Sequence, residues 1–356
     1  MIQFTVRKMR PKYPFLFIGL ILFAACPVFW YISSQWVETK GASAKPTVIS
    51  NRLNLLMTLT NAKSNTAIEE RFLRCLQSML SHATQPMNLY LIADADSMQI
   101  SANLIADLTD VTNATKLLNV QYLNATDVSR RVTEQLSPEF MSLFRHSPEA
   151  YFGDALFFSS LVLHQFMPPW MDKLIVLDID LYFRDDLLNL WSQFDGFSSA
   201  HLIGLANEMQ PVYRHVFSSY RQQHPETSLG GSPPDGLPGF NSGVLLLRID
   251  RLRASDVFAS YILGSKPAED PIFRLASKYS FKGHLGDQDF YTLLATEHLE
   301  LFYLLPCEWN RQLCRWWAEH GYVQVADAYW HCEPSDPQKG IRIYHANCGS
   351  NLPGNV

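Results

Sequence analysis

An apolar run at residues 174–177 ends in the acidic pair Asp178 and Asp180, and this feature restricts the fold most strongly. The run has the length and composition of a buried strand, in which alternate side chains share a face. We therefore expect both carboxylates to face one way. Two anions held together repel each other and resist desolvation unless a cation compensates them. Mg²⁺ or Mn²⁺ is the simplest compensation and typically also binds substrate phosphates. The alternative is a solvated pair in a loop.

Further segments of the chain alternate between strand-like and helix-like patterns. Short apolar runs predict strands, whereas apolar residues spaced by three and four predict helices. One helix should open with a capping box formed by Thr66 and Glu69. The alternation indicates a doubly wound α/β domain with a mostly parallel sheet, in which ligands bind beyond the carboxyl ends of the strands. We expect strands at residues 54–60, 87–93, 120–123, 173–177, 201–206 and 243–249, a helix at 151–165, and a surface loop at 230–239.

The first 50 residues have the pattern of a membrane anchor followed by a stem. Basic residues at positions 7–12 precede an apolar stretch from about residue 15 to residue 32, near the lower limit for crossing a bilayer. Basic residues on the N-terminal side keep that end cytosolic, so the body should be lumenal. A cleaved signal peptide is the alternative, but the sequence offers a poor cleavage site. We expect a cytosolic tail at 1–13, a transmembrane signal anchor at 14–33, a stem at 34–50 and a catalytic domain at 51–356.

Cysteines, glycosylation sequons and net charge agree with a lumenal globular domain. The sequons begin at Asn113 and Asn124, and the net charge of -5 gives no argument for nucleic-acid binding. Cys75 falls on the apolar face of a predicted helix and is expected to be a buried free thiol. Four C-terminal cysteines predict two disulfides with three open connectivities. These four are Cys307, Cys314, Cys332 and Cys348.

Three later segments carry polar side chains next to apolar ones. Asn241 lies in an Asn-Ser-Gly segment before a predicted strand, and its amide can donate and accept hydrogen bonds toward a sugar. Asp287 and Gln288 open a predicted helix, where acidic residues are also ordinary capping groups. His345 ends a short apolar strand, and imidazole suits Mn²⁺ beside carboxylates. Each segment taken alone also fits a purely structural role.

Taken together, these motifs resemble the retaining glycosyltransferases of family 8, which include glycogenin. The likeness is closest to the α-1,3-xylosyltransferases of that family and covers most of residues 150–350. It implies a single GT-A type fold that binds a nucleotide sugar. The segments that carry the likeness are residues 151–158, 208–215, 236–247, 283–290 and 309–314.

The resemblance also implies a metal, a donor and the residues that hold them. The metal would be Mn²⁺, with Mg²⁺ as the alternative ion, bound to the diphosphate of UDP-xylose. Asp178, Asp180 and His345 would be its ligands, and Gln288 would lie under the reacting sugar. The remaining donor-binding residues would be Asn241, Asp287, Asn347 and Asp154.

The acceptor implied by the resemblance is a xylosyl-glucose O-glycan on an EGF-like repeat of a Notch-type protein. Retention of configuration would give an α-1,3-linked xylose. Tyr213, Trp309, Asn310 and Trp317 are the candidate acceptor contacts, and core or loop packing is the alternative role for each. The implied location is the endoplasmic reticulum membrane, with the Golgi as the alternative, and a homodimer is left open.

One feature departs from the family pattern. Most members follow the metal-binding histidine with a glycine and a Lys-Pro-Trp sequence whose lysine contacts the diphosphate. Residues 346–349 after His345 contain no lysine, so the contact must come from elsewhere or be absent, and Arg342 is one candidate.

Three other functions compete with this one. Aspartate-nucleophile phosphatases also place Asp-x-Asp after an apolar strand, but on the first strand of their fold and followed by a Thr or Val where this chain has Tyr182. A binding-only protein that recognises UDP-sugars or EGF modules would have no need of the metal set. A family 8 enzyme that uses UDP-glucose or UDP-galactose differs only in the shape of the sugar pocket.

Overall fold

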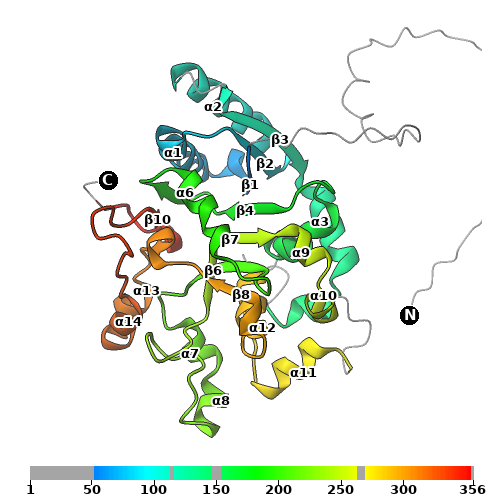
Figure 1. Ribbon diagram of the computed structural model, residues 1–356, viewed down its shortest axis with the longest axis vertical. Coiled ribbons are helices and arrows are strands. Elements are labelled where there is room, and N and C mark those ends of the chain that lie inside the picture. The colour runs from blue at the N-terminus through cyan, green and yellow to red at the C-terminus, as the bar shows by residue number, and fades with distance from the viewer. Residues whose placement is uncertain (1–51, 113–115, 146–153, 263–268, 354–356) are drawn as a thin grey trace, which may run out of the picture. The chain divides into compact units, whose positions relative to one another are not determined.

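The computed structural model describes residues 52–112, 116–145, 154–262 and 269–353. Seven strands in this part of the chain form one sheet in the order β3-β2-β1-β4-β7-β6-β8 (Figure 1). This sheet confirms the expected α/β fold. Its strands are β1 (Leu53–Leu59), β2 (Met87–Ala93), β3 (Leu118–Asn124), β4 (Lys173–Leu177), β6 (Ile203–Asn207), β7 (Phe240–Arg248) and β8 (Phe302–Leu304).

The sheet is mostly parallel, as expected, but β7 runs against both of its neighbours. The four strands β1 to β4 pair in parallel, and so do β6 and β8, whereas β7 is antiparallel to β4 and β6. The sequence prediction placed Asn241 before this strand, but the strand already begins at Phe240. Because β7 is reversed, its beginning lies beside the end of β4, and the Asp178 N–H donates to the Gly243 carbonyl at 2.9 Å.

Alternating side chains of the central strands supply two separate cores, one on each face of the sheet. Leu56 and Leu174 point into the first, whereas Leu55 and Ile175 point into the second. The strands read as continuous apolar runs because both faces are buried. Helices α3, α9, α10 and α12 contribute to the first core and α1, α2 and α6 to the second.

The helices differ from the sequence prediction at two places. Helix α1 begins at Thr66 with Asn65 at its N-cap and no side-chain capping bond, so the predicted capping box is wrong. The described part of the segment predicted as a helix at 151–165 is mainly a 3₁₀ helix at Ala155–Leu161, followed by the short α5. The helices are α1 (Thr66–His82), α2 (Ala95–Thr112), α3 (Ala125–Gln135), α4 (Pro138–Ser142), α5 (Leu163–Phe166), α6 (Leu187–Trp191), α7 (Val212–Val216), α8 (Ser218–Gln223), α9 (Ile249–Arg253), α10 (Asp256–Ile262), α11 (Pro271–Lys278), α12 (Asp287–Ala295), α13 (Trp316–Glu319) and α14 (Val323–Tyr329).

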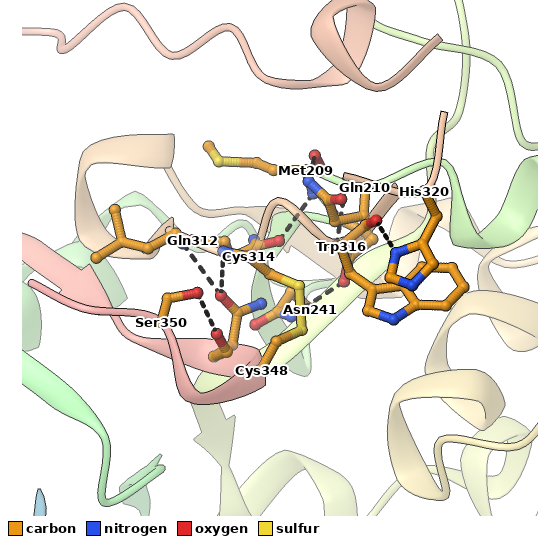
Figure 2. The surroundings of a disulfide bond; sticks show 12 residues. Met209, Gln210, Asn241, Gln312, Cys314, Trp316, His320, Cys348 and Ser350 are labelled. Carbon is orange, nitrogen blue, oxygen red and sulfur yellow. Dashed lines mark hydrogen bonds between the residues drawn. A yellow bond between two sulfur atoms is a disulfide. The ribbon is translucent and has the colours of Figure 1, made fainter. Parts of the chain in front are cut away.

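A second, three-stranded sheet lies beside the end of β4 and is fastened by the C-terminal cysteines. It comprises β5 (Leu181–Phe183), β10 (Ile343–His345) and β9 (Arg311–Gln312), in that order. Two disulfides form, as expected, and the structure decides their pairing as Cys307–Cys332 and Cys314–Cys348. Figure 2 shows the second disulfide beside the segment that holds Gln312 and Cys314. Cys75 is a buried free thiol, as predicted.

Several expectations concern residues 1–51, which lie outside the described residues, as does the sequon at Asn113. The predicted tail, signal anchor and stem therefore stay predictions. Within the described ranges, no helix combines the length and the apolar content needed to cross a membrane. The second sequon begins at Asn124, an exposed residue whose side chain caps helix α3.

Candidate metal and nucleotide-sugar site

Asp178, Asp180 and His345 come together where the two sheets meet. His345 Nε2 lies 3.4 Å from Asp178 Oδ2 and 3.3 Å from Asp180 Oδ1. One potential ligand atom from each residue falls within 4.8 Å of the others. The sequence argument assumed that the acidic pair continues the strand. Instead, β4 ends at Leu177 and the chain turns at residues 179–180. That turn is held by the Ala346 N–H, which donates to the Asp180 carbonyl at 2.9 Å.

Electrostatics link the three groups. Burial opposes a charge on His345, but the carboxylates of Asp180 and Asp178 outweigh it and raise its pKa to about 10. Burial works against the Asp180 carboxylate, yet the facing imidazole and the charge of Arg71 keep its pKa below the usual value. A divalent ion can take the place of the shared proton, because two carboxylate oxygens and an imidazole nitrogen suit Mn²⁺ and Mg²⁺. The three residues therefore fit one such ion.

Two neighbours fix the position of the His345 ring. Asn310 Oδ1 lies 3.0 Å from His345 Nδ1, which directs Nε2 toward the carboxylates. Gly243 on β7 leaves room for the ring, because a Cβ at that position would lie 2.2 Å from His345 Cε1. His345 is only 3% exposed, so it has little space in which to move.

A buried carboxyl group, Glu208, organises the polar side chains next to the histidine. Its Oε2 accepts hydrogen bonds from Asn241 Nδ2 at 3.0 Å and Gln288 Nε2 at 3.3 Å. Burial raises the pKa of Glu208 to about 7. Asn310 Nδ2 donates to Asn241 Oδ1 at 2.9 Å, which connects this group to His345. Sequence reasoning missed Glu208 as a site residue, although it opens the segment 208–215 on which the family resemblance rests.

Gln288 and Asp287 lie at the start of helix α12 and face the beginning of β7. Gln288 Oε1 accepts from the Ser242 N–H at 3.1 Å, so contacts at both ends of the amide set its orientation. Asp287 accepts hydrogen bonds from the hydroxyls of Ser160 and Ser242. Burial and the nearby Asp178 charge raise the Asp287 pKa to about 7. The same helix turn thus contributes a fixed amide and a carboxyl group.

The candidate acceptor residues differ in their access to solvent. The structure does not fit acceptor contact by Tyr213, Trp309 or Asn310, because each side chain is at most 2% exposed. Tyr213 donates to Asp289 Oδ1 at 2.9 Å, and Trp309 lies under the Arg342 guanidinium. Trp317 is partly exposed, and its ring stacks on His215 with 4.2 Å between centroids.

The other expected donor contacts are engaged within the protein. Asn347 Oδ1 accepts from the N–H groups of Leu313 and Cys314, so its oxygen holds the chain beside the disulfide. Asp154 is exposed and caps the 3₁₀ helix at Ala155–Leu161. Arg342 forms an ion pair with Asp185, which argues against the suggestion that it supplies the diphosphate contact.

A cavity of about 400 Å³ lies beyond the carboxyl ends of β1 and β2. Because β1, β2 and β4 are parallel, this cavity is at the same edge of the sheet as Asp178. Its volume is within the range of small-molecule sites. The lining residues are Asn61, Lys63, Ser64, Asp94, Ala95 and Asp96.

Comparison with known proteins decides the family. The sequence model of glycosyl transferase family 8 matches residues 64–314. The chain belongs to this family. Human xyloside xylosyltransferase 1 is 38% identical over 307 residues, which cover 84% of this chain and 74% of the human protein. Mouse xylosyl- and glucuronyltransferase LARGE2 is 29% identical over 281 residues, covering 78% of this chain and 35% of that protein.

A solved structure agrees with this membership in family 8. The crystal structure of mouse xyloside xylosyltransferase 1 in its apo form matches with a TM-score of 0.76 and 36% identity. The match covers 85% of this chain and 99% of the mouse chain. The fold is therefore that of a family 8 glycosyltransferase, and the chain is a glycosyltransferase. The acidic pair, Glu208, Asn241 and Gln288 all fall inside the matched family segment, whereas His345 follows it.

Proposed function

We propose that this chain is a retaining xylosyltransferase that transfers xylose from UDP-xylose. The observation that carries the proposal is the convergence of Asp178, Asp180 and His345 at the ligand-binding edge of a family 8 fold. The xylosyl donor is supported by the names of the human and mouse relatives, which are xylosyltransferases. LARGE2, a more distant relative, also has xylosyl transfer in its name.

Asp178, Asp180 and His345 would hold one Mn²⁺, or Mg²⁺ as the alternative. When bound, such an ion stabilises the negative charge that builds on the UDP leaving group. Asn310 keeps His345 Nε2 directed toward the ion site through its 3.0 Å contact with Nδ1. Asp178 is the more exposed carboxylate, with 57% of its side chain accessible against 17% for Asp180, and thus borders the solvent side of the site.

The nucleoside of the donor would occupy the cavity at the ends of β1 and β2. Uracil offers one N–H donor and two carbonyl acceptors, and this cavity has both acidic side chains and a lysine. Lys63 and Asp96 form an exposed ion pair at 3.2 Å, which a ligand can open at small cost. Asp94 is held more firmly, because it accepts hydrogen bonds from the N–H groups of Asn61 and Ser97.

The sugar would lie between helix α12 and the beginning of β7, near Gln288, Asp287 and Asn241. In the transfer, an acceptor hydroxyl oxygen bonds to C1 of xylose while the bond from C1 to the phosphate oxygen breaks. The bonding electrons leave with UDP, and the hydroxyl proton passes to the departing phosphate oxygen on the same face. Gln288 is suited to lie directly beside the reacting carbon, because hydrogen bonds at both ends of its amide fix its orientation. Asp154 and Asn347 remain secondary candidates for contacts with the donor.

The acceptor would be a xylosyl-glucose O-glycan on an EGF-like repeat, as in Notch-type proteins, extended through an α-1,3 linkage. Trp317 and His215 form a stacked aromatic pair, and such faces bind sugar rings well. Trp316 beside them is 46% exposed. These aromatic side chains are therefore the proposed acceptor surface.

The cellular setting would be the lumen of the endoplasmic reticulum, with the Golgi as the alternative. The two disulfides support an oxidising compartment. The basic and apolar pattern of residues 1–33 supports a type II signal anchor, with a stem at 34–50. Whether two copies form a homodimer stays a prediction.

The test is a transfer assay with the full-length chain, Mn²⁺ and an EGF-like repeat that carries xylosyl-glucose. UDP-xylose, UDP-glucose and UDP-galactose are offered separately, and mass spectrometry identifies the added sugar. We expect one pentose from UDP-xylose alone, and no product from Asp180→Asn. The matched control Asp195→Asn changes a surface carboxylate, 81% exposed, and should keep full activity. Addition of a hexose would refute the donor, and absence of transfer from any donor would refute the acceptor assignment or the activity.

A further inference from the structure

In the part of the chain that the structure describes, the three proposed metal ligands bring no net positive charge for the diphosphate. A divalent ion balances the two carboxylates of Asp178 and Asp180, and an imidazole that binds a metal is neutral. The two phosphates of UDP would then remain uncompensated, which is costly in a partly buried site. Residues 346–349, which follow His345 directly, contain neither lysine nor arginine. A cation must therefore reach the site from another element.

Among the described residues, Arg342 and Arg71 are two candidates for this cation, and they differ in availability. Arg342 is paired with Asp185 and packed over Trp309, with only 11% of its side chain exposed. Arg71 on helix α1 is exposed, and no hydrogen bond or ion pair with another described residue holds its guanidinium. Its charge still acts on Asp180. Arg71 therefore acts electrostatically on Asp180 and has no partner among the described residues that would keep it from binding a ligand anion.

The packing of helix α1 explains why Arg71 is in this position. One turn further along the helix, the Cys75 thiol donates to the Asp178 carbonyl at 3.9 Å. One turn after that, Ser78 Oγ accepts from the Phe183 N–H at 3.0 Å. These contacts align the helix along the turn that carries the acidic pair, and residue 71 is four before Cys75 and so on the same face.

Gly349 brings the segment after the metal-binding histidine up to the same guanidinium. A Cβ at Gly349 would lie 3.2 Å from a guanidinium nitrogen of Arg71, and the residue has a φ of +71° that favours glycine. The guanidinium thus lies between helix α1 and the chain four residues beyond His345.

We propose that Arg71 binds the diphosphate of the nucleotide-sugar donor and supplies the cation that the segment after His345 lacks. Guanidinium presents several N–H groups in a planar fork that matches phosphate oxygens. Arg71 is exposed without a donor present and becomes paired when one binds. This inference rests on the proposed function, because it assumes a nucleoside diphosphate in the site.

The experiment compares binding of UDP, UMP and uridine by titration calorimetry in excess Mn²⁺. The full-length chain is compared with Arg71→Ala, Arg71→Lys and the control Arg74→Ala. Arg74 is a matched control because it lies on the same helix, is 64% exposed and pairs with Glu70. We expect Arg71→Ala to weaken UDP by about 10- to 100-fold, as for a charge-assisted contact, and uridine not at all. Arg71→Lys should restore part of the affinity, and Arg74→Ala should change nothing.

A second readout separates ligand binding from a structural role. Mn²⁺ affinity without nucleotide should not fall in Arg71→Ala, because the arginine repels rather than holds the ion. The proposal is overturned if Arg71→Ala binds UDP normally, weakens UDP and uridine equally, or loses Mn²⁺ affinity. In each of those cases, normal binding by the unaltered chain leaves the proposed function standing. If the unaltered chain does not bind UDP with Mn²⁺, both the proposed function and this inference fail.

Discussion

Replacing Gly243 by alanine should damage the candidate metal site and also lower the stability of the fold. The added Cβ would lie 2.2 Å from His345 Cε1, 2.6 Å from Nδ1 and 3.0 Å from Asp178 Oδ2. Carbon contacts normally measure about 3.5–4.0 Å, so the overlap exceeds about 1 Å. Strand β7 cannot easily retreat, because it is paired on both sides with β4 and β6. The imidazole must therefore move.

The size of the effect follows from how closely metal ligands are placed. Ligand distances vary by only about 0.2 Å, so a displacement of roughly 1 Å removes His345 as an effective ligand. We expect Mn²⁺ affinity to fall by at least about 10- to 100-fold, the cost of disturbing a supporting residue. This corresponds to about 1.4–2.7 kcal/mol of binding free energy. Overpacking should also lower the free energy of unfolding by about 1–3 kcal/mol.

The matched control is Gly204→Ala on the adjacent strand β6. A Cβ there would lie 2.8 Å from Phe197 Cζ and 3.1 Å from Leu246 Cβ, so it overpacks the core without touching a metal ligand. Mn²⁺ binding by calorimetry and thermal unfolding are measured on both variants. We expect both to lose stability and only Gly243→Ala to lose Mn²⁺ affinity. Equal Mn²⁺ affinity in the two variants would refute the geometric argument.

Three further perturbations test the site. Burial lowers the pKa of His345, but Asp180 and Asp178 outweigh burial and raise it to about 10. Without metal, the ring is therefore protonated at neutral pH. Below that pKa, Mn²⁺ affinity should therefore increase about tenfold for each unit by which the pH is raised, because one proton is released per ion bound. Calorimetry in two buffers that shows no proton release would contradict this. Glu208→Gln replaces one acceptor oxygen with an NH2 group, which then faces N–H donors, and should lower kcat by about 10²-fold at unchanged Mn²⁺ affinity. An unchanged kcat would count against Glu208 as a positioning residue. Serine in place of both Cys314 and Cys348 should cost about 2–4 kcal/mol in chemical unfolding, and an unaltered midpoint would show that the crosslink is dispensable.

Local sequence pattern determined most of the strands. The predicted strands at 87–93 and 173–177 have the same bounds as β2 and β4, because strands buried on both faces are continuous apolar runs between polar residues. The number of disulfides and the buried thiol of Cys75 also followed from the chain alone. The motifs of the acidic pair, the Asn-Ser-Gly segment and the terminal histidine were sufficient to indicate the family.

Only the tertiary structure decided which distant groups meet. The direction of β7, the disulfide pairing, the burial of Tyr213, Trp309 and Asn310, and the position of Glu208 depend on contacts between segments far apart in the chain. Sequence periodicity reports which face of one element is apolar, but it does not report what packs against that face. The same reason explains Arg71, an ordinary exposed helix residue in sequence that packing brings beside Gly349, where its charge acts on Asp180.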